Sequence, residues 1–340
     1  MPRPLADVQL ENWQSVVAPY ARPNVRAAVF QTVTTVGLLL IAFGLAFWSL
    51  SISYWLTFGF SLLTSLLSVR TFIIMHDCTH NAFLPSKRAN DIIGFFTGVL
   101  TVTPFAQWRR EHALHHATSG DLDRRGYGDI NTITVAEYKA RSRWGRFKYR
   151  AYRNPLTLLG FGPLYLIVGQ RWRTLSEGTL RKQLTNVWVT NVAIAVMVAS
   201  MSFFFGFWPS MLVFGLTWYI SAVMGIWLFY VQHQYEGTYW EHHGQWDYAA
   251  AAIKGSSYLK LPKVLQWFTG NIGLHHVHHL NPRIPNYNLQ RCHDENPLFH
   301  NAPVLSFTEG LSTLRLTLWD EDSRRLIGFK QLRTDAARSR

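Results

Sequence analysis

Four long apolar stretches restrict the fold of this chain more than any other feature. A helix needs about 20 apolar residues to cross a bilayer, and the stretches occupy residues 27–49, 52–75, 184–208 and 210–231. The second is uncharged as far as residue 69, which places Arg70 near the membrane surface. Charged residues make up only 16% of the chain, against roughly a quarter in soluble domains. We therefore expect an all-α integral membrane protein with four transmembrane helices.

The short gaps between the stretches predict two helical hairpins. About two residues separate the first pair, and "WPS" (208–210) links the second pair. Of the 33 Lys and Arg residues, 17 lie between residues 76 and 183, 12 follow residue 231 and 3 precede the first span. Because basic loops stay on the cytoplasmic side, we expect a single domain (1–340) with a helical cytoplasmic cap built from residues 76–183 and 232–340.

Two shorter apolar stretches and the net charge complete this outline. Residues 92–108 and 155–169 are interrupted by Gly and Pro, which favours interfacial or partly inserted helices. The formal net charge is +13. In a soluble protein this would suggest nucleic acid, but in a membrane protein it marks cytoplasmic loops, so we expect no nucleic-acid partner. The two cysteines, Cys78 and Cys292, indicate no disulfide framework.

The histidines are clustered in three short motifs. "HDCTH" (76–80) contains His76 and His80 at a spacing of four. "HALHH" (112–116) and "HHVHH" (275–279) each place histidines at i, i+3 and i+4. On a helix, such spacings put the imidazoles on one face. A further histidine, His233, stands just beyond the fourth span.

This number of imidazoles indicates a metal centre with two ions. Eight or nine are too many for one ion, and neutral imidazole suits iron, zinc, copper and nickel. No motif contains the glutamate of an HExxH zinc protease. A proton relay would place histidines within the spans, whereas these lie where the spans end. We therefore predict a dinuclear centre that is roofed by the cap and open toward the membrane.

The motifs and their context resemble the integral-membrane fatty acid desaturases. The segments "HDCTHNAF", "HHATSGDLDRRGYGDI", "QHQYEGTYW" and "GSSYLKLPKVLQWFTGNIGLHHVHHLNPRIPNY" look like the acyl-lipid group, which includes Δ12 (ω6) and Bacillus-type Δ5 enzymes. The resemblance covers roughly residues 50 to 295. It implies an O2-dependent di-iron enzyme of a bacterial cytoplasmic membrane. Such an enzyme introduces a cis double bond into an acyl chain of a membrane lipid, in a Δ12/ω6-like manner, with its active site on the cytoplasmic side.

The resemblance also implies the ligands of the two iron ions. They are nine of the fourteen histidines: His76, His80, His112, His115, His116, His233, His275, His278 and His279. His276 occupies the variable position of its motif, and we expect it to be an exposed or supporting residue that binds no metal. We interpret His242, His243, His293 and His300 in the same way. Phe229 stands where the acyl-CoA group carries a water-binding Asn, which favours the acyl-lipid group and leaves one coordination position open.

Other residues near the motifs have candidate supporting roles. Metal-bound histidines need acceptors for their second N–H, and carboxylates or amides close by are Asp77, Glu111, Asp121, Asp123, Asp129, Gln232 and Glu236. Asp77 and Glu111 adjoin histidines directly, so we favour them. Cys78 is expected to pack rather than bind metal. Candidates for lining an acyl channel, or for ordinary helix packing, are Gly94, Gly98, Trp108, Trp188 and Trp227.

The reaction needs two electrons, and no cytochrome b5 signature (HPGG) or nucleotide-binding glycine motif occurs in the chain. We therefore expect a separate electron donor, such as a ferredoxin. The basic segment "KARSRWGRFKYRAYR" (139–153) fits either an acidic donor or anionic lipid headgroups.

Two other functions fit parts of the pattern. A hydroxylase or acetylenase of the same fold would act on the same acyl chains. A histidine-rich metal transporter or sensor belongs to a different class of protein. It would require liganding groups inside the spans, where the sequence has none.

Overall fold

Four long helices confirm the predicted membrane-spanning body. The structure, a computed structural model, describes residues 12–126, 130–169, 171 and 181–338. Its helices of spanning length and composition are α3 (Val25–Ser49), α4 (Tyr54–Thr79), α12 (Arg181–Phe205) and α13 (Phe207–His233). At about 1.5 Å per residue they are longer than a hydrocarbon layer of about 30 Å. The last turns of α4 and α13 can therefore lie outside the hydrocarbon layer.

Both hairpins are present, but the second turn differs from the prediction. The helix α12 ends at Phe205 and α13 begins at Phe207, so the turn is the single residue Gly206 with φ of 88°. Glycine adopts this left-handed conformation without steric cost. The predicted linker 208–210 instead lies in the first turn of α13. Pro209 is tolerated there because the first helical N–H groups have no partner within the helix.

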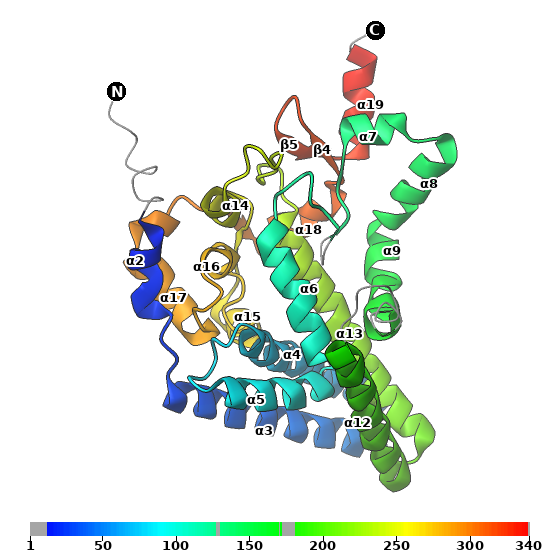
Figure 1. Ribbon diagram of the computed structural model, residues 1–340. Coiled ribbons are helices and arrows are strands. Elements are labelled where there is room, and N and C mark those ends of the chain that lie inside the picture. The colour runs from blue at the N-terminus through cyan, green and yellow to red at the C-terminus, as the bar shows by residue number, and fades with distance from the viewer. Residues whose placement is uncertain (1–11, 127–129, 170, 172–180, 339–340) are drawn as a thin grey trace.

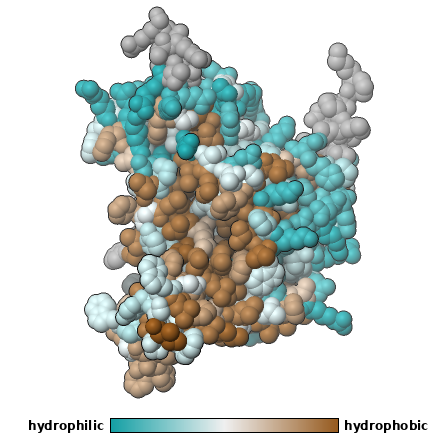
Figure 2. All heavy atoms as spheres, turned by 180° about the vertical axis from the view of Figure 1, so that it is seen from behind, coloured by the Kyte–Doolittle hydropathy of each residue, from teal (hydrophilic) through white to brown (hydrophobic). Residues whose placement is uncertain are grey.

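The central helix of the body is α4, which packs against α3, α13 and α5 (Figure 1). Of its most apolar window, 61% is buried, compared with 11% for α12. The helix α12 faces outward with residues such as Phe203, which is 84% exposed. Figure 2 shows a broad apolar area over the left and centre of the rear face, bordered by polar side chains above and on the right. This is the surface expected of a protein surrounded by lipid.

The predicted apolar stretch 92–108 forms parts of two helices. They are α5 (Lys87–Leu100) and α6 (Phe105–Thr118), and the angle between them is 102°. Where the two helices meet, Gly94 in the middle of α5 packs so closely on Phe105, the first residue of α6, that a Cβ atom would lie 2.2 Å from its ring. Gly94 therefore has a packing role in which the missing side chain admits Phe105. The stretch 155–169 contains α9 (Pro155–Gly160), α10 (Gly162–Leu164) and η2 (Tyr165–Gly169), which lie along α13.

The cap is mainly helical and also contains short strands, which the sequence did not predict. Its other helical elements are α7 (Val135–Ala140), α8 (Arg143–Tyr152), α14 (Tyr248–Lys254), α15 (Lys263–Phe268), α16 (His275–Leu280), α17 (Asn286–Glu295), η3 (Pro297–Phe299), α18 (Phe307–Ser312), η4 (Thr313–Arg315) and α19 (Phe329–Arg338). The N-terminal elements α2 (Trp13–Val17) and η1 (Ala18–Tyr20) pack against the cap at α17. One sheet has the order β1-β4-β5, from Ile133–Thr134, Leu318–Asp320 and Arg325–Ile327; β1 is parallel to β4, and β4 antiparallel to β5. The other pairs β2 (Tyr258–Lys260) with β3 (Val304–Ser306) in parallel.

A fully buried arginine joins the two halves of the cap to the membrane body. Arg153 is 1% exposed. It donates hydrogen bonds to the Tyr230 hydroxyl, to Gln234 Oε1 and to the Leu316 carbonyl, each at 2.9 Å. It also donates to the Asn131 carbonyl at 3.1 Å. These partners come from the end of α13, the central segment and the C-terminal segment. Arg153 therefore holds three separate parts of the chain beside His233.

We predict that Arg153→Leu destabilises the protein by at least about 3 kcal/mol, because it leaves several buried acceptors without a donor. The midpoint of thermal unfolding in detergent measures this. The matched control is Arg143→Leu, ten residues earlier on the exposed side of α8, for which we expect a change within about 0.5 kcal/mol. Equal midpoints for the two variants would contradict the prediction.

Candidate metal centre

The nine predicted histidines lie at the ends of helices. His76 is in the last turn of α4 and His80 is its C-cap. The motif at 112–116 forms the C-terminal half of α6, and His233 is the last residue of α13. The third motif opens the short helix α16. Because a helix carries partial negative charge at its C-terminus, the converging ends of α4, α6 and α13 favour a cation between them.

The nine histidines form two adjacent groups, each able to hold a metal ion. The first group contains five residues: His76, His80, His112, His116 and His278. The second contains four: His115, His233, His275 and His279. Within each group one nitrogen per residue lies within 4.8 Å of all the others. The groups touch, since the rings of His116 and His279 stack with centroids 4.2 Å apart.

The motifs are divided between the groups in a way that the sequence did not indicate. The i, i+4 pair His112 and His116 belongs to the first group, whereas His115 belongs to the second. In the third motif the assignment is reversed: His275 and His279 lie in the second group and His278 in the first. Although a motif shares one helical face, its i+3 residue is rotated far enough to reach the neighbouring group.

The distances between ring nitrogens fit two metal ions. In the first group, His76 and His112 have their Nε2 atoms 3.0 Å apart, and His116 and His278 also 3.0 Å apart. In the second, the Nε2 atoms of His233 and His275 are 3.0 Å apart. Nitrogens at adjacent corners of an octahedron have this separation when the metal–nitrogen distance is about 2.1 Å. The buried Nε2 of His80 has no hydrogen-bond partner in the described part of the chain, which fits a nitrogen that serves as a metal ligand.

Burial keeps the three imidazoles that the third motif contributes to the groups neutral. Desolvation, followed by the neighbouring histidines, holds the pKa of His275, His278 and His279 well below the ordinary value. At neutral pH each therefore offers a lone pair rather than a positive charge, which is the form that binds a metal ion.

The predicted acceptor Asp77 contacts a histidine of the first group. Its Oδ1 lies 3.0 Å from Nδ1 of His76. Its Oδ2 accepts hydrogen bonds from the backbone N–H of Asn286 at 2.6 Å and from the Asn286 side chain at 2.8 Å. Asn286 is fixed in turn by Gln31. This chain of contacts orients the His76 ring so that Nε2 faces the group.

A backbone carbonyl has the same role in the second group. Nδ1 of His233 lies 3.0 Å from the carbonyl oxygen of Gly255. The sequence did not identify this acceptor, because every residue carries a carbonyl and only the fold selects one. Asn286 was missed for a similar reason, since it follows the third motif in sequence and contacts the first in space.

The other predicted acceptors take part in further contacts. Glu111 accepts a hydrogen bond from Gln107, Gln232 donates to the Ile272 carbonyl, and Glu236 contacts Arg325. Asp121 and Asp123 contact His243 and His242, respectively. Asp129 lies outside the described residues.

The comparisons with known proteins agree with this geometry. The model of the "Fatty acid desaturase" family matches residues 52–307, which is most of the chain. A fatty acid desaturase of Bacillus subtilis (strain 168) is 43% identical over 93% of this chain and 90% of its own length. This chain belongs to the fatty acid desaturase family. An sn-1 oleoyl-lipid 12-desaturase of Anabaena variabilis is 26% identical, over 74% of the chain and 72% of its own length. A chloroplastic omega-6 fatty acid desaturase of Glycine max is 25% identical, over 65% and 52%.

As a member of this family the protein is an oxidoreductase, and its site includes apolar neighbours of the histidines. Trp108 stacks on His112 with ring centroids 4.1 Å apart. Phe229 contacts His115, with centroids 5.0 Å apart, and lies 5.6 Å from His233. Trp188, in contrast, is exposed, and Trp227 packs on Phe307. Of the aromatic candidates for an acyl channel, Trp108 is therefore the one in contact with the histidines.

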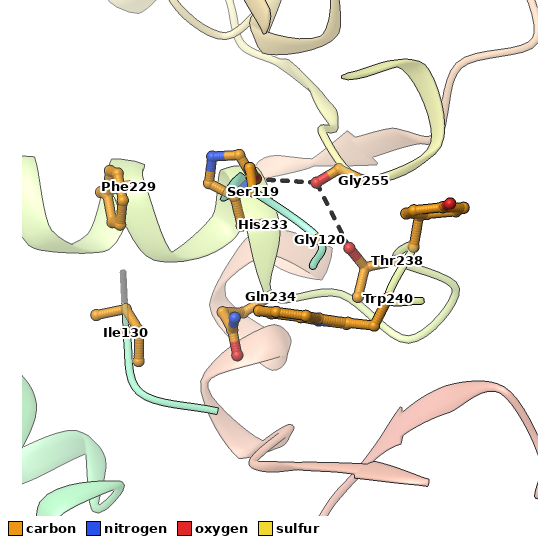
Figure 3. A pocket seen from close by; sticks show the side chains of 10 residues that line it. Ser119, Gly120, Ile130, Phe229, His233, Gln234, Thr238, Trp240 and Gly255 are labelled. Carbon is orange, nitrogen blue, oxygen red and sulfur yellow. Dashed lines mark hydrogen bonds between the residues drawn. The ribbon is translucent and has the colours of Figure 1, made fainter. Parts of the chain in front are cut away.

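A small cavity lies beside the second group of the desaturase site. Its lining includes Phe229, His233, Gln234 and Trp240, with the ends of the segments around Ser119 and Gly255 (Figure 3). Its volume is ≈ 10 Å³, about the space of one water molecule. The buried indole N–H of Trp240 has no hydrogen-bond partner in the described chain.

His276 lies outside both groups, as predicted. Its Nε2 lies 3.1 Å from Nδ1 of His293, and its ring packs on Phe299. It is completely buried rather than exposed, and desolvation lowers its pKa to about 3. Cys78 is also buried and belongs to a hydrophobic cluster with Met75 and Phe83, which agrees with the packing role expected for it.

We predict that Asp77→Asn weakens metal binding by roughly 10- to 100-fold, because the His76 ring loses a charged acceptor. Metal content after dialysis against a graded series of chelator concentrations measures the affinity. Asp123→Asn is the matched control, since Asp123 contacts the exposed His242 and its replacement leaves both groups intact. Equal retention by the two variants would show that Asp77 does not support the site.

We also predict that the metal-free protein loses stability as the pH falls below about 6.5, the ordinary histidine pKa. The folded-state pKa values of His275, His278 and His279 are depressed, so below pH 6.5 the unfolded chain binds more protons than the folded one. Protonation of these histidines should therefore change the unfolding midpoint little between pH 8 and pH 7, and it should lower the midpoint at more acidic pH. A midpoint that rises on acidification would contradict the assignment of buried, neutral histidines.

Proposed function

We propose that this chain is an O2-dependent di-iron desaturase that introduces a cis double bond into an acyl chain of a membrane lipid, with Δ12/ω6-like selectivity. The observation that carries the proposal is the pair of adjacent histidine groups at the ends of the membrane helices. The printed names of the relatives, an oleoyl-lipid 12-desaturase and an omega-6 desaturase, support the choice of lipid substrate and position.

The nine histidines would hold the two iron ions, five on one and four on the other. Bound iron would supply, with O2 and two electrons, the oxidising power that no side chain has. Overall, a CH2–CH2 unit, O2, two electrons and two protons give CH=CH and two molecules of water. Imidazole suits iron, but the donor set alone also admits zinc or copper. The choice of iron therefore rests on the family.

The protein's own contribution is to fix the ligands and to exclude water. Asp77 and the Gly255 carbonyl hold His76 and His233 in the orientation that presents Nε2. Trp108 and Phe229 provide apolar walls next to the two groups. Such walls suit a methylene chain and help to align one C–C bond with the metal centre.

We place the active site on the cytoplasmic side of a bacterial cytoplasmic membrane. The distribution of Lys and Arg supports this orientation, because the two short hairpin turns contain none. The electrons would come from a separate donor such as a ferredoxin. On the exposed side of α8, Trp144 and Phe147 stack on each other, and Arg143 and Lys148 flank them in the sequence. This surface fits anionic lipid headgroups. Its basic residues are also compatible with an acidic donor.

Expression in a host that lacks polyunsaturated lipids tests the function. We expect new diunsaturated acyl chains, with double-bond mapping showing the added bond at Δ12. A product heavier by one oxygen atom would instead identify a hydroxylase. No new unsaturation, with iron and a reductant supplied, would reject the proposal.

Two substitutions within one motif test the ligand assignment. His278→Ala should abolish activity and lower the iron content, because His278 belongs to the first group. His276→Ala, two residues away, should retain both iron ions, because His276 contacts His293 instead. Activity in the His278 variant, or loss of iron from both variants alike, would show that the assignment is wrong.

A further inference from the structure

Arg70 is a cation on a membrane-spanning helix that lacks an acidic partner. Its Nε donates to Thr35 Oγ1 on α3 at 3.1 Å, and one terminal nitrogen donates to the Trp267 carbonyl. No carboxylate contacts it within the described chain. Charged side chains in spans normally pair with one another or serve a function. Arg70 therefore keeps an uncompensated positive charge that the metal centre does not use.

The position of Arg70 along α4 corresponds to the edge of the hydrocarbon layer. It follows Tyr54, the first residue of α4, by sixteen positions, which is about 24 Å along a helix axis. The hydrocarbon layer is about 30 Å thick. The backbone of Arg70 thus lies about 6 Å inside the boundary on the side where the histidines gather, and a long arginine side chain can extend from there toward the lipid headgroups.

The short helix α15 forms an apolar rim next to this charge. The Arg70 guanidinium carbon lies 4.1 Å from the centroid of the Trp267 ring, a cation–π arrangement. Trp267 is 39% exposed, and Val264, one turn earlier on the same side of α15, is 67% exposed. Exposed tryptophan and apolar residues beside a cation are typical of the membrane–water interface.

Helix α4 connects Arg70 rigidly to the histidines. His76 follows Arg70 by six residues on α4. The chain leaving α15 crosses α4 at Gly270, where φ is 52° and a Cβ atom would lie 2.8 Å from Ile73 Cγ2. It then reaches His275 within five residues. A group bound at Arg70 is therefore held at a constant position relative to both groups of the metal centre.

We propose that Arg70, with Trp267 packed on it, binds the phosphate of a membrane glycerophospholipid whose acyl chain is the substrate. The inference rests on the proposed desaturase function and names phospholipid, not an acyl thioester, as the carrier. Two of the five N–H donors of Arg70 are used within the described chain, which leaves three for a phosphate. A planar guanidinium binds phosphate with two parallel hydrogen bonds. Coenzyme A also carries phosphates, but an apolar rim at the membrane–water interface suits a lipid that is already anchored in the membrane by its acyl chains.

The proposal is tested by measuring how a fluorescent lipid binds to the protein in nanodiscs that are made of an uncharged lipid. The probe is phosphatidylglycerol with a pyrene-labelled chain, and binding is followed by energy transfer from tryptophan. The reference ligand is diacylglycerol with the same chains and no phosphate. We expect the intact protein to bind the phosphatidylglycerol probe about tenfold more tightly, the effect of one charge-assisted hydrogen-bonded contact.

Three variants locate the effect. Arg70→Gln should remove the preference for phosphatidylglycerol, and Arg70→Lys should retain part of it, because the charge remains while the fork is lost. Arg181→Gln is the matched control, since Arg181 is an exposed cation at the start of α12, and it should behave like the intact protein. Thermal unfolding verifies that each variant is folded. If Arg70→Gln does not fold, the lipid preference of Arg70→Lys decides whether Arg70 binds the phosphate.

Several results would overturn the proposal. They are an unchanged preference in Arg70→Gln, an equal loss in Arg181→Gln, or equal affinity of the intact protein for diacylglycerol. Palmitoyl-CoA and unlabelled phosphatidylglycerol can also be compared as competitors of the probe. If palmitoyl-CoA displaces the probe more strongly, and this displacement depends on Arg70, the carrier is a thioester instead. The measurement uses no reductant, so it stands even if desaturation fails. Conversely, unsaturated product formed by a protein without the lipid preference would reject only the lipid site.

Discussion

The approach of nine imidazoles to within hydrogen-bonding distance of their neighbours is the interaction on which the rest of the structure depends. Nitrogen lone pairs 3.0 Å apart repel unless a proton or a cation lies between them. Removing such rings from water costs additional free energy. The fold must therefore hold the ring positions against repulsion until metal binds. It does so with helix ends, whose backbone hydrogen bonds make the last turn rigid and whose partial negative charge favours the cation.

The exchange of residues between the two groups follows from this use of helices. A ligand at i+3 is rotated by about 60° from one at i, and in the opposite sense to one at i+4. One motif can thus supply a pair to one ion and a single ligand to the next. With α6 and α16 making reciprocal contributions, neither group can form without the other helix. Two ions bound there would consequently bind in an interdependent manner, and the closeness of the two groups follows from the helix pitch rather than from a separate linker.

The sequence predicted the features that depend on residues close together in the chain, and it missed those that depend on contacts between distant segments. The four spans and the nine histidines depend on local composition and spacing, and they were placed to within a few residues. The second turn was misplaced because Gly206 and Pro209 both signal a break, and only the backbone geometry shows that Gly206 makes the turn. Asp77 was predicted because it adjoins His76. The Gly255 carbonyl and Asn286 were missed because their contacts join segments distant in sequence. Two strand pairings of the cap likewise join distant segments: β1 pairs with β4 across the second hairpin, and β2 pairs with β3 across α15, α16 and α17.

The helix α4 brings together most of what the proposed reaction requires. It carries His76 for the first group, Asp77 to orient that histidine, and Arg70 toward the lipid. A lipid anchored by its phosphate at Arg70 would enter with its ester end fixed relative to the metal centre. The carbon that reaches the oxidant would then be set by counting from the ester end of the chain, not from its methyl end. Selectivity would depend on the length of acyl chain between Arg70 and the histidines, and Trp108, which stacks on His112, is a residue beside the metal centre whose size should shift the position of the double bond.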